Sequence, residues 1–389
     1  MIEAHGEIWT IKELFTYPNE YIYWTIHIAI YPYITGLVAG AFVLSSFYHV
    51  FGVKELKPVA RFSLLFSLAL LIMAPTPLLF HLTQPQRNYE MLLTPHFYSA
   101  IASFTVVYLT YMFIVVYEIW VAYRPFIIAQ AQQGKFLYKI LTLGSYDLST
   151  QALHTDEKAI KFLAAIGIPS AAFLHGYVGF IFGSVKAVPF WKTPLMPFIF
   201  LMSAVISGVA LCIATYVIIC KLSKRVLDVT AVQSMGKILS WFIIIAFLFE
   251  AIDLVFHGYL AEEFWEPLSV LLFDKLFVKI FVMQWGFGMI LPFILLILPR
   301  LTVTRAFISS ILVIVGVFMM RMNVIQGGGQ GLSKSLSGFM TYKLPIIPHN
   351  METFREGLFA AVFLLAMPFV LLWIFNKILP IFKSQESGH

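Results

Sequence analysis

Three groups of polar side chains lie inside long apolar runs of the sequence, where such groups are costly unless they meet a partner, a cavity or a ligand. They are His27 in the first run, His175 and Tyr177 in the run GIPSAAFLHGYVGFIFG, and Glu250, Asp253 and His257 in a later run. Imidazole and carboxylate groups are suited to carrying protons, and a phenol is a hydrogen-bond donor. The six residues therefore predict a site for proton transfer or for a polar ligand.

The spacing of these residues indicates how helices would position them. Glu250, Asp253 and His257 are spaced i, i+3, i+7, which stacks them on one face of a helix. In the second group, Gly176 and Gly179 are small enough to let neighbouring helices come close. The alternative for that group is a packed helix whose polar groups are simply satisfied by neighbouring helices.

The composition places these residues in a membrane. The chain has 389 residues, of which 60% are hydrophobic and 12% charged, whereas a soluble domain carries about a quarter charged residues. The net charge of +6 does not indicate nucleic-acid binding, because the basic residues lie in short loops between apolar runs. The N-terminus lacks the features of a cleaved signal peptide, so we expect the first run to be a retained span. Cys212 and Cys220 form no CxxC pattern, so neither an iron–sulfur cluster nor any other metal site is expected in this chain.

A span needs about 20 apolar residues, and by that measure the sequence predicts an all-α polytopic protein with about nine transmembrane helices. The predicted spans are 21–51, 59–83, 96–124, 159–184, 194–221, 235–258, 276–298, 302–322 and 357–381. The segment 261–275 is apolar enough for a short interfacial helix, so the range is eight to ten spans. The predicted division is an N-terminal segment 1–20, a membrane core 21–322, a GGGQG-containing connection 323–356, and a last helix with its tail, 357–389.

Basic residues are unequally divided between the two sides. The loops after the first, third, fifth and seventh spans, with the C-terminus, hold most of the Lys and Arg, whereas the opposite loops carry Glu262, Glu263 and Glu266. The positive-inside rule then predicts a multi-pass protein of the cytoplasmic membrane, with the N-terminus outside and the C-terminus in the cytoplasm.

With that topology the polar residues fall at one depth. At 1.5 Å of rise per residue, His27 lies ~9 Å below the outer edge, and His175 and Tyr177 lie about 10–13 Å below it. The Glu250 group approaches the same edge. His81, Gln84 and Gln284 also fall there, although a lone His81 is more often an interfacial residue. On the other half, Glu118 is equally consistent with a proton route or with a carboxylate that reaches the interface.

An apolar pocket that carries His, Tyr and carboxylates suits a quinone, whose ring needs apolar walls and whose oxygens need hydrogen-bond partners. Haem b is the rival ligand, because His27 and His175 could supply two axial nitrogens. A proton- or ion-translocating transporter is the alternative from another class, since such proteins also bury acids in their spans.

Several short motifs resemble the membrane subunits of the polysulfide reductase family, also called NrfD-like. The motifs are Gly36-Leu-Val-Ala-Gly40-Ala41 followed by Lys54-Glu55-Leu56-Lys57, the loop Gln84-Pro-Gln-Arg87, and Gly167-Ile-Pro169 with His175-Gly-Tyr177-Val-Gly179. The resemblance implies two four-helix bundles without haem, and a quinone site at the outer side next to an iron–sulfur subunit. It implies quinone contacts at His27 and Tyr177.

The last part of the chain extends beyond that eight-helix core and looks like the larger, DsrP-like members of menaquinol-oxidising complexes associated with sulfite reduction. From the residues and the resemblance together, we expect menaquinol oxidation or menaquinone reduction. His27 and Tyr177 would hold the quinone oxygens, Asp253 and Glu250 would carry protons, and His175 and His257 would assist. The expected partners are a ferredoxin-like iron–sulfur subunit on the outer side, a multihaem cytochrome and a second membrane subunit.

Overall fold

The computed structural model describes residues 22–82, 84–186, 188–260, 265–330, 340–342, 347 and 351–382. The predicted N-terminal segment 1–20 and the tail beyond residue 382 lie outside this part. The transmembrane region consists of α2 (Ile26–His49), α3 (Lys57–Met73) with α4 (Thr76–His81), α6 (Ala100–Gln132), α8 (Thr150–Gly183), α9 (Met196–Leu222), α10 (Val229–Leu260), the π-helix η4 (Val278–Ile290) with α12 (Leu291–Ile297), α13 (Val303–Gln330) and α15 (Leu358–Ile378). Shorter elements are η1 (Lys54–Leu56), η2 (Pro85–Arg87), α5 (Glu90–Leu93), α7 (Phe136–Leu141), α11 (Trp265–Val270), the π-turn η3 (Leu271–Lys275), α14 (Met351–Glu356), and the strands β1 (Ile22–Trp24) and β2 (Met340–Tyr342).

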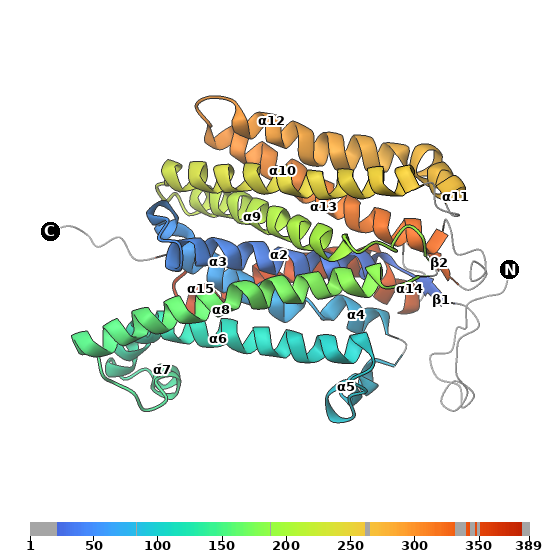
Figure 1. Cartoon of the computed structure of the whole chain (residues 1–389). Coiled ribbons are helices and arrows are strands. Elements are labelled where there is room, and N and C mark those ends of the chain that lie inside the picture. The colour runs from blue at the N-terminus through green and yellow to red at the C-terminus, as the bar shows by residue number, and fades with distance from the viewer. Residues whose placement is uncertain are drawn as a thin grey trace.

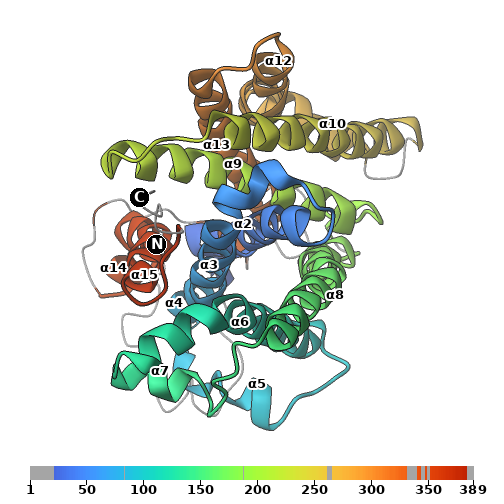
Figure 2. The same ribbon diagram turned by 90° about the vertical axis from the view of Figure 1, so that its left-hand side faces the viewer.

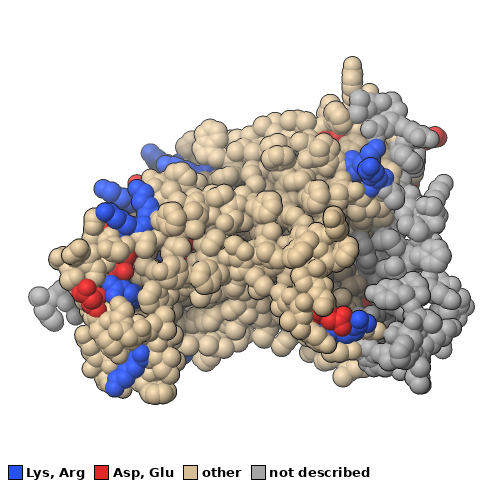
Figure 3. Space-filling model, turned by 60° about the horizontal axis from the view of Figure 1, so that its bottom comes forward, with Lys and Arg blue, Asp and Glu red and all other residues tan. Residues whose placement is uncertain are grey.

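Nine helices within the described residues are long and apolar enough to cross a membrane, which confirms the predicted fold class. Successive spans run in opposite directions, so the segments that connect them lie at two opposite ends of the molecule, one on each side of the membrane. At one end, here called the strand end, β1 pairs in parallel with β2 beside the start of α2 (Figure 1). The other end, here called the α7 end, carries α7 and the end of α15. Charged side chains gather near the two ends, with a broad band of other residues between them (Figure 3).

The spans form two four-helix bundles, as the family resemblance implied. The first bundle contains α2, α3 with α4, α6 and α8, and the second contains α9, α10, η4 with α12, and α13. In the end-on view α15 lies against the first bundle, on the side away from α8 (Figure 2). The contact between α2 and α9 joins the two bundles, and both helices are almost completely buried there.

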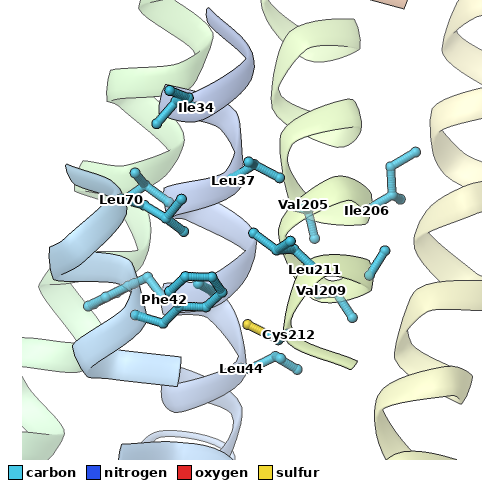
Figure 4. Close-up of a cluster of buried hydrophobic side chains, with 14 of the residues drawn as sticks. Ile34, Leu37, Phe42, Leu44, Leu70, Val205, Ile206, Val209, Leu211 and Cys212 are labelled. Carbon is cyan, nitrogen blue, oxygen red and sulfur yellow. The ribbon is translucent and has the colours of Figure 1, made fainter. Parts of the chain in front are cut away.

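Glycines make the α2–α9 contact close. A Cβ added to Gly40 would lie 2.5 Å from the carbonyl oxygen of Val205 and 2.6 Å from the Cα of Gly208. Leu37, Val209 and Cys212 fill the space beside this crossing (Figure 4). Small residues therefore let the two backbones touch, which is how helices associate where lipid gives them no hydrophobic driving force.

Gly40→Ala is expected to destabilise the folded protein by about 1–3 kcal/mol, because its methyl group would have to push two helix backbones apart. Thermal unfolding of the detergent-purified protein measures this. Gly176→Ala is the matched control, since a Cβ there would meet nothing closer than 3.9 Å. Equal unfolding temperatures for the two variants would mean that the α2–α9 crossing can relax.

Two predicted helix boundaries are wrong. The helix predicted to begin at residue 159 begins at Thr150, where the Ser149 hydroxyl caps it by accepting from the Ala152 N–H at 3.2 Å. The predicted connection 323–356 is helical up to Gln330, although glycines normally disfavour helix. There the rings of Phe190 and Trp191 occupy the positions that side chains at Gly327 and Gly328 would need. The segment 261–275 supplies the short α11 and η3 within its described residues and no additional span.

Candidate functional site

A pocket opens at the strand end of the second bundle, between α9, α10, η4 and α13. Its cavity has a volume of about 100 Å³ and is open to the outside. We call it the acidic pocket, and its polar residues are Glu250, Asp253 and His257 from α10, Gln284 and Trp285 from η4, and Asn323 from α13. Its apolar wall includes Phe190, Met196, Ile199, Leu254, Leu268, Leu272, Ile280, Met320 and Val324. An apolar wall with a few convergent polar groups is typical of a small-molecule site.

Glu250 is held from two neighbouring positions of η4. The Gln284 side-chain amide and the Trp285 indole N–H both donate to its Oε2, each at 2.7 Å. Asn323 donates to Gln284 Oε1 at 2.8 Å, which fixes the orientation of the amide. A π-helical segment re-aims side chains relative to an α-helix and is frequent at functional sites. The other oxygen, Oε1, is buried without a hydrogen-bond partner among the described residues.

Asp253 and His257 continue the same face of α10 toward the strand end. The Thr193 hydroxyl donates to Asp253 Oδ1 at 2.5 Å. The His257 ring donates from Nδ1 to the Asp253 carbonyl at 2.8 Å, and the same nitrogen is 3.7 Å from Oδ1. In the neutral ring this leaves Nε2 as the atom that accepts a proton. The i, i+3, i+7 spacing places the three titratable groups on one face of α10, and all three line the acidic pocket.

His27 belongs to a different group, at the start of α2. Its Nδ1 is 3.5 Å from the Thr25 hydroxyl, which is also 3.3 Å from His81 Nδ1. His81 lies 3.6 Å from Glu356, the last residue of α14. The His27 ring is fully buried and stacks on Phe80, with the ring centroids 6.2 Å apart. Its Nε2 has no hydrogen-bond partner among the described residues.

Tyr177 connects to this group through aromatic rings. Its ring stacks on Phe104 of α6, with the centroids 6.2 Å apart, and Phe104 meets the ring of Tyr31 edge-on at 6.0 Å. Tyr31 is one turn after His27 on α2. His175, two residues before Tyr177, is 2% exposed, and its Nε2 also lacks a partner within the described part of the chain. The two residues of the His-Gly-Tyr motif thus have different surroundings.

Arg321 on α13, which the sequence analysis missed, lies where the two bundles meet. It is 1% exposed, its guanidinium donates to Ser203 Oγ at 2.8 Å and to the Phe200 carbonyl at 3.3 Å, and it lies over the Phe200 ring at 3.9 Å. It also interacts electrostatically with Glu250 and His175. A single cation near the end of an apolar run was a signal in the sequence that could have identified it.

The six predicted residues therefore lie toward one end of the molecule but do not share one chamber. Glu250, Asp253 and His257 line the acidic pocket, while His27, His175 and Tyr177 are not among the residues that line it. The expectation of one common pocket is corrected to two groups, and Arg321 interacts with His175 and with Glu250. The physical reason is that depth along a helix follows from residue count, whereas position around the bundle depends on packing.

The structure also places two other polar features of the sequence, the Gln84–Arg87 loop and Glu118. In the Gln84–Arg87 loop, Arg87 donates to both oxygens of Glu90 at 2.9 Å and to Gln84 Oε1 at 3.3 Å. These hydrogen bonds hold the loop in place, and they lower the pKa of the Glu90 carboxyl.

Glu118 is fully buried on α6, and neither of its oxygens has a hydrogen-bond partner among the described residues. It therefore does not reach the interface. No cluster of three or more possible metal ligands occurs in the described part of the chain.

Comparison with known proteins gives a family match over most of the chain. A family model described as polysulphide reductase, NrfD, matches residues 15–332, which include both bundles. A selenate reductase subunit of Mesobacillus selenatarsenatis is 29% identical over 314 residues, or 78% of this chain and 73% of that protein. A putative dimethyl sulfoxide reductase membrane subunit of Halobacterium salinarum is 25% identical over 312 residues, or 79% and 69%. An Hdr-like menaquinol oxidoreductase integral membrane subunit of Archaeoglobus fulgidus is 23% identical over 238 residues, or 61% and 52%.

Proposed function

Because the chain belongs to the NrfD family of polysulphide reductase membrane subunits, we propose that it is the quinone-reactive membrane subunit of a respiratory oxidoreductase complex. The relatives named as reductase subunits, and the Archaeoglobus relative named as a menaquinol oxidoreductase subunit, support this proposal. The substrate we propose is menaquinol, oxidised to menaquinone, with the reverse reaction as the alternative direction.

The observation that carries the proposal is the set of buried titratable atoms without partners toward the strand end. His27 Nε2, His175 Nε2 and Glu250 Oε1 have no hydrogen-bond partner among the described residues. Buried polar atoms are normally hydrogen-bonded, so each is available to a ligand or to a transferred proton. A quinone supplies two oxygens for such bonds and, on oxidation of the quinol, releases two electrons and two protons. The residues present therefore fit this ligand.

We assign the hydrogen bonds to the quinone oxygens to His27 and Tyr177. The buried His27 ring offers Nε2 as an acceptor when the tautomer carries its proton on Nδ1. Tyr177 offers a hydroxyl, and the aromatic rings of Tyr31 and Phe104 lie between the two residues. Flat aromatic walls suit a planar ligand.

Proton release is assigned to the acidic pocket. Glu250 would accept a proton on its free Oε1, and Asp253 and His257 would pass it toward the strand end along one face of α10. His175 is buried and interacts with Arg321, as Glu250 does. It would hold the intermediate position in this route.

Electrons leave through a partner in this proposal, which the relatives named as subunits of reductases support. The proposed acceptor is a ferredoxin-like iron–sulfur subunit docked at the strand end, with a multihaem cytochrome and a second membrane subunit as further members of the complex. The distribution of basic loops supports placing the strand end outside the cytoplasmic membrane.

His27→Ala and Tyr177→Phe test the site directly. In the assembled complex, each is expected to lower the rate of menaquinol oxidation by about tenfold or more, because each removes a hydrogen bond to a quinone oxygen. His96→Ala and Tyr98→Phe are the controls, since both residues are exposed at the same end. Unchanged menaquinol oxidation in both site variants would remove His27 and Tyr177 from the site.

Proton or ion translocation without quinone chemistry is the second candidate, favoured by the buried Glu118, whose oxygens lack partners among the described residues. A flux assay with the isolated chain in vesicles separates the two functions. Proton flux in the absence of partner subunits and quinol would favour translocation.

A further inference from the structure

A basic recess lies at the α7 end, where α15 packs against the first bundle. Its cavity has a volume of about 720 Å³ and is open to the outside. Four of its lining residues are cations, Lys57 and Arg61 on α3, Lys135 before α7, and Lys377 on α15. No aspartate or glutamate is among the described residues that line it, and none of the four cations is ion-paired with a described carboxylate. The recess therefore concentrates positive charge that nothing described in the chain neutralises.

The recess is built by contacts between the core and α15. The Tyr138 hydroxyl on α7 donates to the Ile378 carbonyl at 2.7 Å, and the Tyr123 hydroxyl on α6 donates to the Pro380 carbonyl at 2.9 Å. Arg61 lies over the Tyr123 ring at 5.1 Å. These bonds hold cations from α3 and α15 around one opening, and α15 lies beyond residue 332, where the family match ends.

Exposed apolar groups surround the recess. On α7, Phe136 is 78% exposed and Ile140 is 55% exposed, so this short helix presents an apolar face outward. On α15, Trp373 is 61% exposed, and Lys377 lies over its ring at 5.3 Å. Amphipathic helices, Trp and long Lys side chains are typical of the interface between headgroups and acyl chains.

We propose that this recess binds the phosphate-bearing headgroup of an anionic phospholipid, with the acyl chains against the exposed apolar residues of α7 and α15. Basic pockets between transmembrane helices are suited to such headgroups. The four cations match a headgroup with two phosphates, such as diphosphatidylglycerol. Free phosphate would contact the cations alone, whereas the lipid would also contact the exposed apolar residues of α7 and α15. The lipid would thereby join α15 to the family core.

The test uses the purified full chain, with its partners, in detergent micelles. Native mass spectrometry with added diphosphatidylglycerol measures the affinity of the lipid adduct. Lys57→Gln combined with Lys377→Gln is expected to weaken it by about tenfold or more. Lys158→Gln combined with Lys161→Gln is the matched control, because these exposed lysines on α8 lie at the same end and the charge change is equal.

Equal weakening in both double variants would overturn the proposal, since it would mean general attraction to the positive end of the protein. Equal binding of phosphatidylcholine would overturn it as well. Displacement of the lipid by millimolar inorganic phosphate would identify a phosphate site in place of a lipid site. If a double variant fails to fold, the binding of diphosphatidylglycerol and of phosphatidylcholine to the wild-type protein still tests the proposal.

Discussion

Glu250→Gln is expected to lower the turnover number for menaquinol oxidation by about 100-fold, the lower range for loss of a group that transfers a proton. The amide keeps the shape of the side chain and still accepts from Gln284 and Trp285 through one oxygen. The amide nitrogen that replaces Oε1 cannot take up a proton. The effect should therefore fall on proton transfer and leave the structure of the pocket intact.

The Michaelis constant distinguishes two roles for the acidic pocket in the same experiment. Loss of a proton carrier lowers kcat while KM stays unchanged, whereas loss of a residue that binds quinone in both ground state and transition state raises KM. Glu266→Gln, an exposed carboxylate on α11 at the same end, is the control. If Glu250→Gln oxidises menaquinol at the wild-type rate, the acidic pocket takes no part in the reaction.

Arg321→Met is expected to lower menaquinol oxidation by about tenfold or more while the unfolding temperature stays the same or rises. Burying a charge that is not ion-paired lowers the stability of the folded protein, and Arg321 forms no ion pair with a carboxylate in the described part of the chain. A cation that is 1% exposed within an apolar span is therefore retained for function. We expect it to balance the charge of Glu250, with which it interacts within the second bundle.

Activity and thermal unfolding must be measured together for this variant. Ser203→Ala is the companion variant, because it removes the 2.8 Å hydrogen bond to Arg321 and leaves the charge in place. It should have a much smaller effect on activity. A lower unfolding temperature with unchanged activity in Arg321→Met would assign Arg321 a structural role.

Local sequence was enough to predict the helices. Each span is a run of apolar residues, and each turn of helix satisfies its own backbone, so the number of spans follows without knowledge of their neighbours. The same reasoning placed the polar residues toward one end. It did not predict that α13 continues through Gly327 and Gly328, because the rings that pack on those glycines come from residues 190 and 191.

The tertiary structure alone decided which polar residues meet. Nothing in the sequence spacing says toward which neighbouring helices His27 on α2 or Glu250 on α10 will point, and the two belong to separate groups. Thr193, Asn323 and Arg321 join the site from distant parts of the chain. Their positions depend on how α9, α10, η4 and α13 pack against one another. The sequence thus determined the spans and the depth of each polar group, because both follow from composition and residue count. The lateral arrangement of those groups depends on side-chain packing between helices. That packing joins residues far apart in the sequence, so no local pattern predicts it.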